Sequence, residues 1–218
     1  MSLGLIFGAI SILFAAFIAF AFGGISFQIN HSSESSSILM TLGASLLVFT
    51  IGAMAEEAFF RGYILQTFSR ASLVWFGVIL TSVFFATVHN SNPNANFLSW
   101  FNTFLAGIWF GVAYLKTRNL WFPFGIHLAW NWFQGAVLGI NVSGIKELTT
   151  APLFQTTTNN DLNWLTGGDY GIEGGLACTF ALIFSTVSDL VRAVLKTNPG
   201  NACFQQSRNS EANNRLVI

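Results

Sequence analysis

The sequence predicts an all-α fold, a polytopic bundle of about six transmembrane helices. Of 218 residues, 53% are hydrophobic and only 8% are charged, whereas soluble domains carry about a quarter charged residues. Six long apolar stretches recur along the chain, and a helix needs roughly 20 residues to cross the hydrocarbon core. The stretches are continuous rather than alternating, which excludes a closed transmembrane β-barrel.

We expect the six spans at residues 4–24, 38–60, 73–88, 97–115, 121–140 and 176–195. The second span is predicted to continue as a helix through Phe68, and the third is short. The first stretch lacks a basic flank and exceeds the core of a usual signal peptide, which favours a span over a cleaved leader. Residues 1–196 are therefore predicted to form a single transmembrane catalytic domain, followed by a polar, disordered tail over 197–218.

Lys and Arg residues predict the orientation of the spans. If the spans alternate, seven basic residues share one side: Arg70, Lys116, Arg118, Arg192, Lys196, Arg208 and Arg215. Only Lys146 falls on the other side, so the positive-inside rule places both termini in the cytoplasm. The polar connection over 141–175 then faces outward, and we expect a bacterial-type plasma membrane protein. The formal net charge of zero offers no footprint for nucleic acid.

Ionisable side chains recur inside these apolar segments, although each costs on the order of 2.5–3.5 kcal/mol at mid-bilayer. The second span holds Glu56, Glu57 and Arg61, the third ends at His89, and the fifth holds His127 and Asn131. Residues four apart lie on one helical face, so Glu57 is predicted to pair with Arg61. Glu56 is rotated by about 100° and has no local partner.

The depth of these groups can be compared along the predicted hairpins. A tight turn near Ala71 joins the second and third spans, so Glu56 and His89 should differ in depth by roughly 5 Å. Their meeting is geometrically reasonable. His127 should be shallower than His89, unless helices tilt or the 119–123 segment dips inward.

Such a set of groups can hydrolyse a peptide bond. Glu56 would act as general base on a water also held by His89. His127 and Asn131 can donate hydrogen bonds to the developing oxyanion. Glu57 and Arg61 would support this arrangement. The same groups also allow a metal site, in which Glu56, His89 and His127 would bind zinc with water in the open position.

Three spaced motifs carry a family resemblance. They are Glu56-Glu57-x-x-x-Arg61, Phe85-x-x-x-His89 and His127-x-x-x-Asn131, in that order. The chain resembles the CPBP family of intramembrane proteases, which includes CAAX-prenyl endopeptidases and bacteriocin-immunity relatives (the Abi family). The TGGDYGIEGG run at 166–175 also looks like bacterial members. The resemblance implies that Glu56 and His89 activate water while His127 and Asn131 bind the oxyanion, and that the substrate is a membrane-associated or C-terminally lipidated, CaaX-like peptide.

Two non-protease interpretations use the same groups. A membrane scaffold or bacteriocin-immunity protein could bind a peptide or partner protein in the polar cavity without cleaving it. A proton-coupled transporter would also bury Glu and His, but the chain shows no internal repeat typical of such proteins. The protease hypothesis is preferred because Glu56, His89, His127 and Asn131 are all present.

Overall fold

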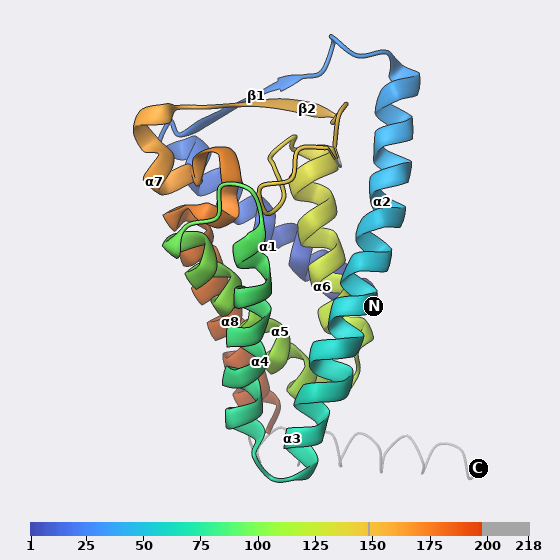
Figure 1. Cartoon of the computed structure of the whole chain (residues 1–218), viewed down its shortest axis with the longest axis vertical. Helices are drawn as coiled ribbons and strands as arrows, with labels where there is room; N and C mark the ends of the chain where they lie inside the picture. The colour runs from blue at the N-terminus through green and yellow to red at the C-terminus, as the bar shows by residue number, and fades with distance from the viewer. Residues whose placement is uncertain (148, 198–218) are drawn as a thin grey trace, which may run out of the picture.

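The computed structural model describes residues 1–147 and 149–197, which form a helical bundle capped at one end by a two-stranded sheet (Figure 1). Helices occur in all six predicted segments, so the predicted fold class is confirmed. The tail predicted over 197–218 lies outside the described residues except for Thr197, the last residue of α8.

Within residues 1–147 and 149–197, four helices are long and apolar enough to cross a membrane. They are α1 (Ser2–Ala21), the continuous helix Ser35–Arg70, the segment Val74–Ser91 that contains α4 (Val74–Val88), and α5 (Phe97–Thr117). The helix Ser35–Arg70 comprises α2 (Ser35–Glu57), the π-helical turns of η1 (Ala58–Leu65) and α3 (Gln66–Arg70). The predicted helical continuation through Phe68 is therefore confirmed.

The helices α6 (Trp121–Trp132) and α8 (Leu176–Thr197) complete the bundle. α6 continues into the π-helical turn η3 (Phe133–Val137). α8 contains a shorter apolar helix over Leu176–Val191. Both occupy predicted spans, and the fifth ends a few residues earlier than expected.

Glycines allow close contact between neighbouring helices. A Cβ atom added at Gly8 of α1 would overlap the carbonyl group of Ile126 in α6, and one added at Gly107 of α5 would lie 2.8 Å from Cα of Ser82 in α4. Small residues serve this purpose in membrane bundles. The absence of a side chain at Gly107 thus allows α4 and α5 to pack closely.

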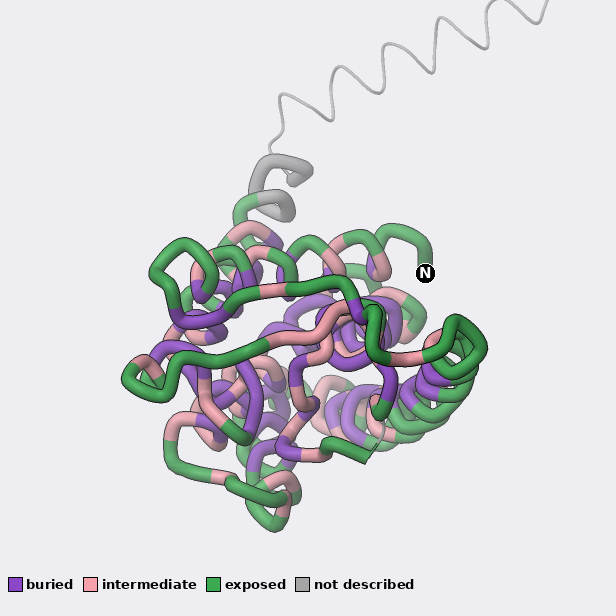
Figure 2. The backbone as a smooth tube through the Cα atoms, turned by 90° about the horizontal axis from the view of Figure 1, so that it is seen from above, coloured by how far each residue is buried: buried purple, intermediate pink, exposed green. Residues whose placement is uncertain are grey.

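Apolar side chains face outward as well as inward. Figure 2 shows the buried backbone concentrated toward the inside of the bundle and exposed backbone around it. On α1, Leu3, Ile6, Ile10 and Phe17 are all more than half exposed. Exposed apolar surface of this extent is what lipid contact requires, and the protein is an integral membrane protein.

The sequence did not predict the two-stranded sheet that caps one end of the bundle. β1 (Ile25–Ile29) and β2 (Phe154–Thr158) pair antiparallel with Ile25 opposite Thr158, and β2 lies within the long polar connection. Three consecutive threonines, Thr156–Thr158, favour an extended backbone, but their partner strand is more than 100 residues away. The connection also forms α7 (Asn163–Thr166) and the 3₁₀ turns η4 (Asn160–Leu162), η5 (Gly168–Tyr170) and η6 (Ile172–Gly174). The cap lies at the opposite end of the bundle from α3 (Figure 1).

Candidate active site

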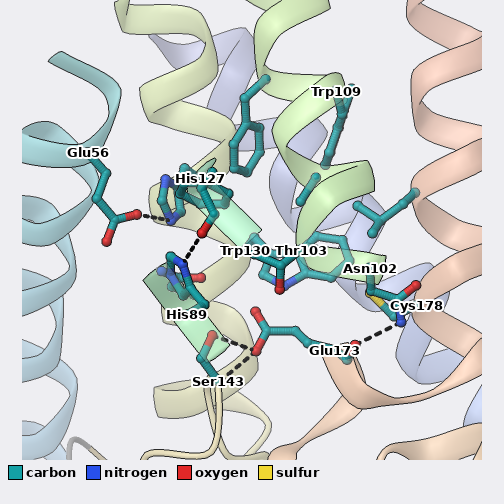
Figure 3. A pocket seen from close by; sticks show the side chains of 15 residues that line it. Glu56, His89, Asn102, Thr103, Trp109, His127, Trp130, Ser143, Glu173 and Cys178 are labelled. Carbon is teal, nitrogen blue, oxygen red and sulfur yellow. Dashed lines mark hydrogen bonds and ion pairs between the residues drawn. The ribbon is translucent and has the colours of Figure 1, made fainter. Parts of the chain in front are cut away.

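A single cavity of about 60 Å³ collects the four side chains predicted to be catalytic. Glu56 comes from α2, His89 from the end of α4, and His127 and Asn131 from α6. Figure 3 shows Glu56, His89 and His127 directed toward one another. The cavity is polar and large enough to hold water, since a buried water needs roughly 10–15 Å³ of such space.

Glu57 is the centre of a buried charge network beside the cavity. Its Oε1 accepts a hydrogen bond of 2.9 Å from Nη1 of Arg61 and one of 3.0 Å from Nδ1 of His127. Arg61 also donates from Nη2 to the carbonyl oxygen of Gly107 at 3.1 Å. The predicted Glu57–Arg61 pair is therefore confirmed. The contact with His127 was not predicted, and it means that Glu57 holds a histidine of the cavity directly.

Aromatic rings surround the same network. The guanidinium carbon of Arg61 lies 4.9 Å from the ring centroid of Phe85 and 5.0 Å from that of Phe110. Phe110 also stacks on the imidazole of His127, with centroids 4.9 Å apart. These rings exclude lipid and water from the ion pair and favour its positive charge by cation–π attraction.

The depth of His127 is explained by the connection between α5 and α6. A Cβ atom added at Gly62 of η1 would lie 3.1 Å from Cδ1 of Leu120, so this connection packs about two turns above the end of α3 at Arg70. Leu120 also packs with Leu65 in a small apolar cluster. Of the alternatives left open by the sequence, the inward position of the 119–123 segment is the one observed, and it brings His127 level with Glu57.

Hydrogen bonds define the tautomer of each imidazole in the cavity. Nδ1 of His89 lies 2.7 Å from the carbonyl oxygen of Phe85. A carbonyl can only accept, so Nδ1 carries the proton and Nε2 of a neutral His89 is an acceptor. Nδ1 of His127 likewise donates to Glu57, which leaves its Nε2 toward Glu56, 3.7 Å from Oε2.

Glu56 has fewer protein partners than the neighbouring Glu57. Its side chain is 35% exposed, but its Oε2 is buried and has no hydrogen-bond partner among the described residues. Buried polar oxygens are nearly always satisfied by protein or water, so this atom is suited to hold a water molecule. The π-helical turns of η1 begin directly after Glu57, and such turns occur frequently at functional sites.

The zinc alternative stays a prediction. Among the residues that the structure describes, no three His, Cys, Asp or Glu side chains are grouped so as to hold a metal ion. The Nδ1 contacts of His127 and His89 do not decide the question, because both rings keep Nε2 free of them. We therefore derive the chemistry of the cavity from its own side chains.

Sequence reasoning missed two residues that line the cavity, Ser143 and Glu173 of the long polar connection. The only signal was the glycine-rich TGGDYGIEGG run. Gly167 and Gly171 in it have positive φ of 81° and 98°, which only glycine adopts at little cost. These turns fold the connection back so that Glu173 enters the bundle.

Burial raises the pKa values of two side chains in this connection, Glu173 and Tyr170. Desolvation raises the pKa of Glu173, opposed by hydrogen bonds from the backbone and side chain of Ser143 and the side chain of Gln134, and by the charge of His89. Burial also raises the pKa of Tyr170 to about 12, with the nearby Glu173 charge adding to the effect. The protonated form of Glu173 is thus favoured relative to an exposed glutamate.

A groove of about 320 Å³ adjoins the cavity and shares Glu56, His89, Asn131 and Ser143 with it. Its apolar lining comes mainly from α2 and the start of the polar connection: Val48, Phe49, Gly52, Ala53, Val142 and Ile145. The reactive groups are therefore reached along a groove that combines an apolar α2 wall with polar side chains.

Comparison with known proteins agrees with the motifs. Residues 35–133 match the family model of type II CAAX prenyl endopeptidase Rce1-like proteins. An uncharacterized protein, YyaK of Bacillus subtilis (strain 168), is 30% identical over 112 residues, covering 46% of this chain and 35% of that protein. An uncharacterized 24.3 kDa protein of Escherichia coli is 29% identical over 93 residues, covering 42% of this chain and 41% of that protein.

The chain thus aligns with less than half the length of these two relatives. No solved structure matches it. The family match includes Glu56, Glu57, Arg61, His89, His127 and Asn131. Residues 35–133 are therefore similar to the Rce1-like family of type II CAAX prenyl endopeptidases, and this match contains all three motifs.

Proposed function

We propose that this protein is an intramembrane endopeptidase that hydrolyses a peptide bond in a membrane-associated substrate. The observation that carries the proposal is that Glu56, His89, His127 and Asn131, contributed by three separate helices, line one cavity. A packing role for each residue would not require their convergence on a space large enough for water.

Water activation is assigned to Glu56 and His89. A water held by the unsatisfied Oε2 of Glu56 and by Nε2 of His89 lies between two acceptors, so each of its protons has a partner. Glu56 removes one proton as the water oxygen attacks the substrate carbonyl carbon. General base catalysis of this kind contributes roughly 10²–10⁴-fold to rate.

Oxyanion stabilisation is assigned to His127 and Asn131. Glu57 holds Nδ1 of His127 at 3.0 Å, so a protonated His127 presents Nε2–H to the cavity beside the amide of Asn131. The charges balance in this state, because Glu57 faces Arg61 and Glu56 faces His127. Donors positioned before the reaction stabilise the developing negative charge most effectively.

The adjoining groove favours an apolar, membrane-associated substrate. A peptide lying along Phe49, Gly52 and Ala53 reaches Glu56 and His89 along the apolar α2 wall of the groove. The family description names CAAX prenyl endopeptidases, so lipidated, CaaX-like C-termini are the first substrates to test. We also propose the orientation that basic residues indicate, with both termini in the cytoplasm of a bacterial-type cell.

The purified protein, reconstituted in lipid nanodiscs, tests the proposal on fluorogenic peptides with and without a prenyl group. Glu56→Gln and His89→Ala should each lower kcat by about 10²–10⁴-fold, and Asn131→Ala by about 10²–10³-fold. Glu34→Gln, at the exposed N-cap of α2, is the control and should cleave normally. A chelator added to the same assay checks metal dependence.

Wild-type cleavage by Glu56→Gln would refute the assignment of the base. A protein that cleaves no peptide, while Glu56→Gln preserves its cellular phenotype, would instead support the binding-protein hypothesis.

A further inference from the structure

We propose that Glu173 is the general acid that protonates the leaving amine, a role outside the three motifs. This inference rests on the proposed peptidase function. Glu173 lies in η6 of the long polar connection and lines the same cavity as Glu56 and His89. The cavity therefore holds a second carboxyl group, contributed from outside the spans.

The backbone and side chain of Glu173 are both held in place. Its Oε2 accepts hydrogen bonds from the backbone nitrogen of Ser143 at 2.6 Å and from Oγ of Ser143 at 3.1 Å. Its carbonyl oxygen accepts a bond of 2.8 Å from Nδ2 of Asn102 in α5. Nδ2 of Asn102 also donates a hydrogen bond of 2.9 Å to the carbonyl oxygen of Gly175. These contacts fix the carboxyl group relative to the bundle.

Ser143 holds only one of the two carboxyl oxygens of Glu173. Both donors from Ser143 meet Oε2, and Figure 3 shows the other oxygen of Glu173 directed toward the centre of the cavity. A proton on Glu173 is therefore expected on Oε1, because Oε2 already accepts two hydrogen bonds. A carboxylic acid in this position presents O–H to the substrate.

The surroundings of Glu173 favour retention of that proton. Burial raises the pKa of Glu173 as its largest effect. The titratable groups that face it are His89 from η2, Tyr170 from η5 and Cys178 from α8. Only a charged His89 opposes the proton, and His89 is neutral in the proposed water activation; Tyr170 and Cys178 add no positive charge.

The reaction balances with this acid. Water adds to the carbonyl carbon as Glu56 takes one of its protons, which gives a tetrahedral intermediate. The C–N bond then breaks as Glu173 donates its proton to the amine nitrogen, leaving a carboxylate on Glu173. Proton transfer from Glu56 through solvent restores the acid, and no oxidant, reductant or second reactant is needed.

Cleavage of a thioester substrate distinguishes a general-acid role of Glu173 from a purely structural role. A departing thiolate has a conjugate-acid pKa of about 8.5 and leaves without protonation, whereas an amine needs the proton. Matched amide and thioester forms of the peptide cleaved by the wild type are compared in Glu173→Gln. We expect kcat on the amide to fall by about 10²-fold or more, and kcat on the thioester by less than about threefold.

Glu147→Gln is the matched control, because Glu147 is an exposed carboxylate of the same connection. It should cleave both substrates like the wild type. If Glu173→Gln cleaves the amide normally, or loses both activities equally, Glu173 is not the acid. If Glu173→Gln does not insert into the membrane, Glu173→Asp replaces it, because aspartate keeps an acid at a greater distance from the substrate. Glu173→Asp should lose less activity than Glu173→Gln, and the loss of kcat should be confined to the amide substrate. Equal losses of kcat on the amide and the thioester would overturn the proposal.

The two proposals fail in different ways. Glu56→Gln should lose both amide and thioester cleavage, because each needs activated water. Retention of both by Glu56→Gln would count against the peptidase mechanism itself, whatever Glu173→Gln does.

Discussion

Glu57 and His127 are 70 positions apart in the sequence, yet Oε1 of Glu57 lies 3.0 Å from Nδ1 of His127. The same oxygen accepts a 2.9 Å bond from Arg61, so one atom joins two helices through two nitrogen donors. A carboxylate that holds one imidazole nitrogen fixes the tautomer and orientation of the ring. The second acidic residue of the motif is thus a positioning residue for His127.

Replacement of Glu57 by Gln should reduce both stability and activity. It leaves Arg61, which is 0% exposed, without its carboxylate, and removal of one partner of a buried pair costs about 3–5 kcal/mol. Loss of the charge behind His127 should lower kcat by about 10–100-fold. Melting temperature and kcat in nanodiscs measure the two effects.

Glu56→Gln serves as the comparison for stability. Glu56 is 35% exposed and accepts no hydrogen bond at Oε2, so its variant should melt within a few degrees of the wild type while losing activity. Equal melting temperatures for Glu57→Gln and the wild type would show that the Glu57 network does not support the fold.

Gly8→Ala should impair catalysis from a distance. A Cβ atom there would overlap the carbonyl group of Ile126, the residue before His127, so α6 must shift to accommodate it. Displacements of about 1 Å can cost about 10²-fold in rate. Steady-state kcat and melting temperature should both fall.

Gly43→Ala is the matched helical control. A Cβ atom at Gly43 meets nothing within 4 Å, and alanine in a helix interior is favoured over glycine by roughly 0.5–1 kcal/mol. This variant should keep wild-type activity with equal or higher stability. Similar behaviour of the two variants would contradict close α1–α6 contact as a requirement of the site.

Gly52→Leu should weaken substrate binding rather than chemistry. Gly52 lines the apolar α2 wall of the groove, and a Cβ atom there meets no atom within 4 Å, so a larger side chain fills the groove without disturbing the helix. We expect KM to rise by about tenfold, with kcat changed much less. Kinetics with the best peptide substrate measure both constants.

Gly43→Leu adds the same side chain to the same helix outside the residues that line the groove. Its KM should match that of the wild type. An unchanged KM in Gly52→Leu would mean that substrates approach the cavity by another route.

The sequence alone predicted the membrane class, the six helical segments and the Glu57–Arg61 pair. Each of these depends on local information: hydrophobic length for a span and four-residue spacing for the pair. Glu56, His89, His127 and Asn131 could also be singled out, because polar groups inside apolar helices are costly and therefore conspicuous.

Only the tertiary structure decided how those groups meet. The depth of His127 depends on Leu120 packing against Gly62, and the β1–β2 pairing joins strands more than 100 residues apart. Glu173 reaches the cavity because glycine turns fold a polar connection into the bundle. Composition and residue spacing determine whether a single segment forms a helix that is stable in lipid. Contacts between helices depend on the shape complementarity of two segments, which neither segment shows by itself.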